Sequence, residues 1–259
     1  MKLVELSDCS LCVEPIFIDE VADEDTLVVF LHEALGSIGQ WKSFPTLVCQ
    51  KLKLNGLVYE RQGYGKSSEL SKDRGVEYLH EYAWKELPEL IETIVAPNKK
   101  ILLVGHSDGG SIALLYGAKY PERVKGIVSM AAHVIVEDVT LQGIQPAMDA
   151  FALGKLDGLY KYHGEKTKRL FHAWCDTWNM EAFKLWNICQ DIQSIKAPIL
   201  AIQGVNDQYG TALQVDLIHE SAPDAPFQKL MIPKCGHHPH LESQQEVLDS
   251  IINWYNAIF

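Results

Sequence analysis

The run Gly-His-Ser-Asp-Gly at residues 105–109 directly follows the apolar stretch 101–104. A Gly-x-Ser-x-Gly pattern at the junction of a buried strand and a helix is typical of a tight turn that exposes a serine as a nucleophile. The two glycines lack Cβ atoms, so strand and helix can approach closely while Ser107 stands out from the backbone. Because a serine hydroxyl is a weak nucleophile by itself, the chain must also supply a base and oxyanion donors.

A carboxylate that could orient the base follows a second apolar run. Asp207 lies in a glycine-flanked loop just after residues 198–203, and functional residues of parallel sheets collect at the carboxyl ends of strands. Such a carboxylate holds a histidine in the right tautomer and stabilises its cation. Glu137 and Asp138, near the end of an earlier expected strand, are the alternative acids.

Histidines that could act as the base cluster near the C-terminus, in the run Cys-Gly-His-His-Pro-His at residues 235–240. We predict that His237 takes the proton of Ser107 and later returns it to the leaving group. His238 and His240 are the alternatives, and His240 is expected to support the loop by hydrogen bonding. Nucleophile, acid and base then follow one another along the chain as Ser107, Asp207 and His237.

In this order of residues the chain resembles the α/β-hydrolase superfamily. Further segments match that family's loops after its third and fourth strands, its turn before the sixth strand and its final histidine segment; they are residues 31–37, 60–67, 120–124 and 236–242. Glu33 replaces the glycine usual in the first of these loops, and Glu60 replaces the usual aspartate in the second. The resemblance implies an oxyanion hole made by the backbone N–H groups of Ala34 and Asp108, and it places the catalytic histidine directly after Gly236.

Strands and helices alternate along most of the chain, which predicts a mostly parallel central sheet flanked by helices, the α/β-hydrolase fold. Two edge strands are expected within residues 1–20. The segments expected as further strands are residues 26–31, 56–59, 101–104 and 126–130. Helices are expected over residues 38–53, over 77–95 with a kink at Pro88, and at the C-terminus.

Residues 138–193 break this alternation, because they contain no convincing strand. In the family this position carries a helical cap, so we expect a core of residues 1–137 and 194–259 and a helical cap insertion of residues 138–193. Trp174 and Trp178 either line a substrate pocket beneath this cap or pack it against the core. Glu33 either contacts the substrate or forms a structural ion pair, for instance with Arg61.

Composition narrows the partners. The formal net charge is -11, which argues against nucleic acid and anionic membrane surfaces as partners. No apolar run reaches the roughly 20 residues of a membrane-spanning helix, and the acidic residues near the start do not suit a signal peptide, so a cytoplasmic location is expected. The six cysteines do not indicate a disulfide scaffold in a chain of this length.

Neither a catalytic metal nor an organic cofactor is expected, because the chain lacks His-Glu-x-x-His and Gly-x-Gly-x-x-Gly patterns. The leading hypothesis is therefore a cofactor-free serine hydrolase that cleaves a small ester, thioester or related acyl substrate through an acyl-enzyme on Ser107. Carbon–carbon bond hydrolysis or lyase chemistry on the same three residues is an alternative, and so is a small-molecule sensor that uses the pocket only for binding. The sequence does not indicate the oligomeric state.

Overall fold

An eight-stranded sheet forms the centre of the computed structural model, which describes residues 1–259. Its strands lie in the order β1-β2-β4-β3-β5-β6-β7-β8. β2 pairs antiparallel with both β1 and β4, and all other neighbours pair parallel. The strands are β1 (Lys2–Glu5), β2 (Ser10–Ile16), β3 (Thr26–Leu31), β4 (Asn55–Tyr59), β5 (Lys100–His106), β6 (Val124–Met130), β7 (Ile199–Gly204) and β8 (Phe227–Ile232). The mostly parallel sheet and the two strands within residues 1–20 confirm the predicted fold class.

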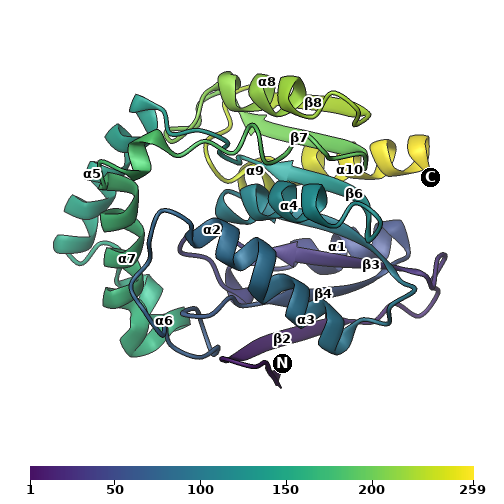
Figure 1. Cartoon of the computed structure of the whole chain (residues 1–259), viewed down its shortest axis with the longest axis horizontal. Coiled ribbons are helices and arrows are strands. Elements are labelled where there is room, and N and C mark those ends of the chain that lie inside the picture. The colour runs from purple at the N-terminus through teal and green to yellow at the C-terminus, as the bar shows by residue number, and fades with distance from the viewer.

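Helices cover both faces of the sheet (Figure 1). The longer ones are α1 (Phe44–Leu52), α3 (Leu87–Ile94), α4 (Asp108–Lys119), α5 (Asp138–Ala152), α7 (Thr167–Asn179), α8 (Ala212–Ser221) and α10 (Gln244–Ile258). The short ones are α2 (Tyr78–Glu81), α6 (Tyr160–His163) and α9 (Pro239–Glu242), with the single turns η1 (Ile38–Trp41), η2 (Tyr82–Glu86), η3 (Asp157–Leu159), η4 (Gly164–Lys166) and η5 (Phe183–Leu185).

The core has two parts, one on each face of the sheet. Apolar side chains of α1 and α10 pack with one set of strand residues, which includes Val28 and Leu102. Side chains of α3, α4 and α8 pack with the alternate set, which includes Val29 and Leu103. Strands covered on both faces must be apolar at nearly every position, which explains why β3, β5 and β7 stand out in the sequence as continuous apolar runs.

Two of the predicted helices are interrupted. The expected helix over residues 38–53 is divided into η1 and α1, because Lys42 between them has a positive φ of 53°. The expected helix over residues 77–95 is present as α2, η2 and α3, with a π-helical turn at η2 just before Pro88. Proline cannot donate to the carbonyl four residues earlier, which here belongs to Trp84 and accepts from the Tyr120 hydroxyl instead, at 3.5 Å.

The segment between β6 and β7 contains no strand of the sheet, and α5, α6 and α7 lie together beyond one end of the strands (Figure 1). The side chains of Trp174 and Trp178 are buried along α7. The division of the chain into a core and a cap at residues 138 and 193 stays a prediction. None of the helices is both long and apolar enough to cross a membrane.

Candidate active site

Ser107 occupies a tight turn between β5 and α4. Its backbone has φ 53° and ψ −119°, a conformation that a non-glycine residue rarely adopts. Glycine is required on both sides: a Cβ at Gly105 would lie 2.2 Å from the carbonyl oxygen of Gly109, and one at Gly109 would lie 1.9 Å from that of Leu31. The Ser107 N–H donates to the carbonyl of Met130 at 2.8 Å, which ties the turn to β6.

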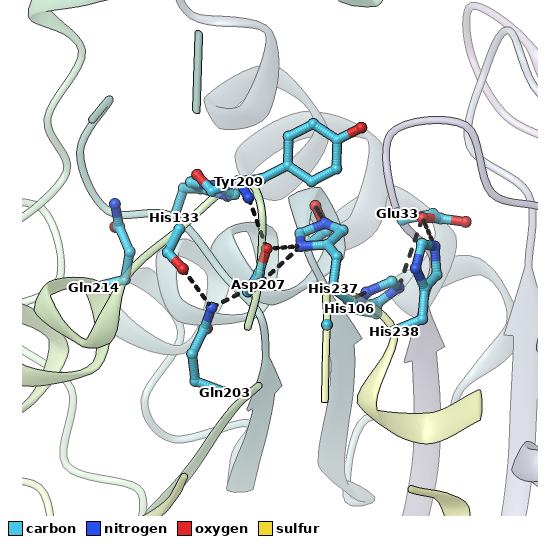
Figure 2. Close-up of polar contacts among 12 residues, drawn as sticks. Glu33, His106, His133, Gln203, Asp207, Tyr209, Gln214, His237 and His238 are labelled. Carbon is cyan, nitrogen blue, oxygen red and sulfur yellow. Dashed lines mark hydrogen bonds and ion pairs between the residues drawn. The ribbon is translucent and has the colours of Figure 1, made fainter. Parts of the chain in front are cut away.

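Three of the predicted site residues form a hydrogen-bonded chain. The Ser107 hydroxyl lies 3.0 Å from His237 Nε2, in position to donate to it. On the other side of the ring, Nδ1 donates to the Asp207 carboxylate at 2.8 Å (Figure 2). All three residues are buried. The structure therefore brings together residues that are 100 and 30 positions apart in sequence, since they lie at positions 107, 207 and 237.

The Asp207 carboxylate accepts more than one hydrogen bond. Gln203, a buried side chain on β7, donates to Oδ2 at 2.7 Å, and the Tyr209 N–H donates to Oδ1 at 2.8 Å. Burial alone would raise the pKa of Asp207, but the hydrogen bond and charge of His237 outweigh burial and lower it. Asp207 is thus held in the ionised form that stabilises an imidazolium. No sequence pattern indicates a role for Gln203, which lies in an otherwise apolar strand.

The alternative acids have other partners. The Glu137 carboxylate accepts from the Thr211 hydroxyl at 2.6 Å and from the Gln214 amide at 2.7 Å, and it caps the start of α5. Asp138 is the first residue of that helix. Among the candidate carboxylates, only Asp207 is bonded to the His237 ring.

The other two histidines of the cluster do not contact Ser107. His238 Nε2 lies 3.0 Å from the Glu33 carboxylate. The predicted hydrogen-bonding role of the His240 side chain is wrong. Its Nδ1 is buried without a partner, and its ring packs against Trp41 and Phe44, with centroids 4.7 and 5.5 Å away. Its contribution to the loop is therefore aromatic packing.

Glu33 does not form the expected ion pair with Arg61. The Arg61 guanidinium donates instead to the backbone carbonyl of Glu33 at 2.8 Å and to that of His32. The Glu33 carboxylate faces His238 and, at 3.9 Å, His106. Burial alone would raise the pKa of Glu33, but the hydrogen bond from His238 and its charge lower it to about 2. Burial holds the pKa of His106 well below its usual value.

The backbone groups expected to stabilise an oxyanion are free to do so. Asp108 is the first residue of α4, so its N–H has no acceptor within the helix. The N–H of Ala34 is without an acceptor in the structure. Both residues line the same cavity as Ser107 and His237.

This cavity has a volume of about 730 Å³, within the usual range for small-molecule sites. Ser107, His237 and Glu33 lie on its wall, and Trp174 and Trp178 line it as well. The Trp178 indole N–H donates to the Tyr78 hydroxyl at 2.9 Å, which fixes its ring. The remaining apolar lining comes mainly from the helical segment between β6 and β7, and comprises Val139, Ile144, Pro146, Ala147, Leu156 and Leu159.

Comparison with known proteins gives a consistent picture. The family model of the α/β hydrolase fold matches residues 26–170. The human serine hydrolase BPHL is 27% identical over 239 residues, which cover 88% of this chain and 78% of that protein. Among solved structures, a putative lipase from Acinetobacter baumannii superposes with a TM-score of 0.78 at 19% identity, over 99% of this chain and 91% of its own. An enol-lactonase from Burkholderia xenovorans superposes with a TM-score of 0.76 at 14% identity, over 98% and 100%.

Proposed function

The chain belongs to the α/β hydrolase fold family, and on that premise we propose that it is a serine hydrolase cleaving a small ester, thioester or related acyl substrate. The observation that carries this proposal is the chain of hydrogen bonds from Ser107 through His237 to Asp207 on the wall of a large cavity. The similarity to a curated serine hydrolase supports it. A serine hydroxyl bonded to a buried, carboxylate-oriented imidazole can be activated as a nucleophile.

In the proposed reaction, Ser107 Oγ attacks the substrate carbonyl while its proton passes to His237 Nε2. The N–H groups of Ala34 and Asp108 stabilise the negative charge that develops on the carbonyl oxygen. His237 then donates its proton to the leaving group, which departs and leaves an acyl-enzyme on Ser107. A water molecule, deprotonated by His237, attacks this ester, and the acid is released as Ser107 recovers its proton.

The cavity disfavours an anionic substrate and suits one with an apolar group. Its wall contains aliphatic residues and two tryptophans but no lysine or arginine, and the carboxylates of Glu33 and Asp108 are part of it. A carboxylate on the substrate would lose its hydration there without gaining a counter-charge. We therefore exclude anionic acyl compounds and place the substrate among neutral or cationic ones of moderate size.

The test is hydrolysis of p-nitrophenyl butyrate and labelling by a fluorophosphonate probe, each with wild type and Ser107→Ala. We expect the wild type to turn over and to be labelled, and the variant to retain its fold but lose labelling and at least about 10³-fold in kcat. Undiminished turnover by the variant would exclude Ser107 as the nucleophile. Labelling of the wild type without turnover would instead favour the carbon–carbon hydrolase or lyase, or the sensor.

A further inference from the structure

Three side chains next to the Ser107 site come together from separate segments of the chain. Glu33 follows β3, His106 ends β5, and His238 immediately precedes α9. The Glu33 Oε2 atom lies 3.0 Å from His238 Nε2 and 3.9 Å from His106 Nδ1 (Figure 2). The three possible ligand atoms all lie within 4.8 Å of one another. None of these side chains has a hydrogen bond to Ser107 or Asp207.

The hydrogen bond of His106 fixes which of its ring nitrogens carries a proton. Nε2 lies 2.6 Å from the backbone carbonyl oxygen of His237, which can only accept, so Nε2 is the donor. In the neutral ring, Nδ1 then carries a lone pair. This lone pair faces the carboxylate of Glu33 at 3.9 Å, so two acceptors point toward each other with no hydrogen between them. A cation between them would satisfy both.

We propose that Glu33, His106 and His238 bind a divalent transition-metal cation of the zinc class, which takes the place of the proton that His238 Nε2 donates to Glu33 and releases it to solvent. Two imidazole nitrogens and one carboxylate oxygen are a ligand set that zinc uses, with the fourth position left for water. Zinc lies about 2.0–2.2 Å from such atoms, which separates neighbouring ligands by about 3.3–3.6 Å in a tetrahedral site. The separations here, from 3.0 Å up to the limit of 4.8 Å, enclose that range. Side-chain rotations that move each ligand atom by less than about 1 Å would complete the site.

The surroundings allow an ion and its water to enter. The three residues line a second cavity of about 200 Å³, and Glu33 and His238 also line the larger one beside Ser107. On the wall of the second cavity, Ser37 Oγ and Gln40 Oε1 are buried without a partner. Both oxygens can accept a hydrogen bond from a metal-bound water.

An ion at this place would join two loops of the proposed active site. It would hold Glu33, the residue before Ala34, and it would hold His106, whose Nε2–H binds the carbonyl of His237. Because none of the ligand side chains is hydrogen-bonded to Ser107, the ion would be a structural element that fixes the loop after β3 relative to the end of β5. The metal site consists of these three side chains alone and does not depend on the proposed hydrolase activity.

The test is calorimetric titration of chelator-treated protein with zinc sulfate, using wild type, Glu33→Gln, His238→Asn and the control His172→Asn. His172 is an exposed histidine on α7, outside the cluster. We expect one zinc per chain in wild type and in the control, and an affinity at least about 100-fold weaker in the two ligand variants. Absence of stoichiometric binding, or equal affinity in all four proteins, would overturn the proposal.

A second measurement does not depend on enzyme activity. Cobalt(II) bound to nitrogen and oxygen ligands in a tetrahedral site absorbs visible light, so its spectrum reports the ligands directly. We expect a visible band in wild type and in His172→Asn that is absent in Glu33→Gln. Zinc should also raise the Tm of the first two proteins and leave that of Glu33→Gln unchanged. Melting curves without metal verify that each variant is folded.

Discussion

His237 is held from several directions, and each contact uses a different part of the residue. Its ring donates to Asp207, and its backbone carbonyl accepts from His106. The backbone N–H groups of the two residues that flank it, Gly236 and His238, donate to the Glu242 carboxylate at 2.7 and 3.0 Å. A ring fixed in this way is ready to accept the proton of a nucleophile without reorganisation, which is the arrangement that favours general base catalysis.

We expect Asp207→Asn to fold normally and to lose about 10³–10⁴-fold in kcat. The amide keeps the size of the side chain, but it neither stabilises the imidazolium nor fixes the tautomer that leaves Nε2 free to accept from Ser107. Steady-state hydrolysis of p-nitrophenyl butyrate measures the loss. The matched control is Glu137→Gln, which should stay within a few-fold of wild type. If the two variants exchanged these behaviours, the acid would be Glu137.

The buried carboxyl of Glu86 should make the stability of the folded protein depend on pH. Burial raises the pKa of its carboxyl to about 7, against the hydrogen bond that it accepts from the Gln62 N–H at 2.8 Å. The folded protein therefore holds this proton up to about pH 7, whereas the unfolded chain releases it near the ordinary value of 4.5. Through this group, stability is greatest below pH 4.5 and falls as the pH rises to about 7.

We expect the free energy of unfolding of Glu86→Gln, relative to that of wild type, to increase as the pH is raised from about 5 to about 8. The expected increase is on the order of 1 kcal/mol. Glutamine keeps an acceptor for the Gln62 N–H without a charge to bury. Urea unfolding of both proteins at several pH values measures the difference. A constant difference across this range would show that Glu86 ionises normally in the folded protein.

At the scale of the elements, the site is built where parallel strands end. Ala34 follows β3, Ser107 follows β5, Asp207 follows β7 and His237 follows β8. These carboxyl ends share one edge of the sheet, so residues far apart in sequence meet there whenever the strand assignments are right. The apolar runs and glycine-flanked loops therefore predicted that the serine and the acid lie at this edge, and the family resemblance selected His237 among the three histidines. The catalytic roles of these residues stay a prediction.

Other features could not be predicted from the sequence, some because they depend on packing between distant segments and others because they are local changes of the backbone. The pairing of Glu33 with His238 joins residues 205 positions apart, and no spacing pattern connects them. Gln203 lies in a run of buried apolar residues, and its partner Asp207 becomes apparent only once the loop after β7 is folded. The positive φ of Lys42 and the π-helical turn before Pro88 are local backbone responses that periodicity does not reveal.

The turn that presents Ser107 should be intolerant of side chains. A Cβ at Gly109 would lie 1.9 Å from the carbonyl oxygen of Leu31, a backbone atom of the central sheet that cannot move away cheaply. We expect Gly109→Ala to lose about 3 kcal/mol or more of stability, together with fluorophosphonate labelling. Gly75→Ala is the matched control, because a Cβ there meets nothing within 4 Å. Thermal unfolding compares the two, and equal Tm values would contradict the close approach of strand and helix.

At the scale of the whole molecule, the net charge and the cavity wall both disfavour an anionic substrate. The net charge is -11, and the cavity beside Ser107 has carboxylates on its wall but no lysine or arginine. An anionic substrate is repelled at long range by the overall field and at short range by the carboxylates. A neutral acyl compound experiences neither effect and gains from burial against Trp174 and Trp178.

Two esters of equal length test this preference: p-nitrophenyl butyrate and the mono-p-nitrophenyl ester of succinate, which carries a terminal carboxylate in place of the methyl group. We expect kcat/KM to be at least about 10-fold lower for the succinate ester. Added salt should reduce this difference in kcat/KM only in part, because salt screens the long-range field and not the contacts inside the cavity. The substitution Asp108→Asn should reduce the difference in kcat/KM further, since it removes one carboxylate from the cavity wall. Equal or faster hydrolysis of the acidic ester would show that a cationic group outside this wall binds the substrate.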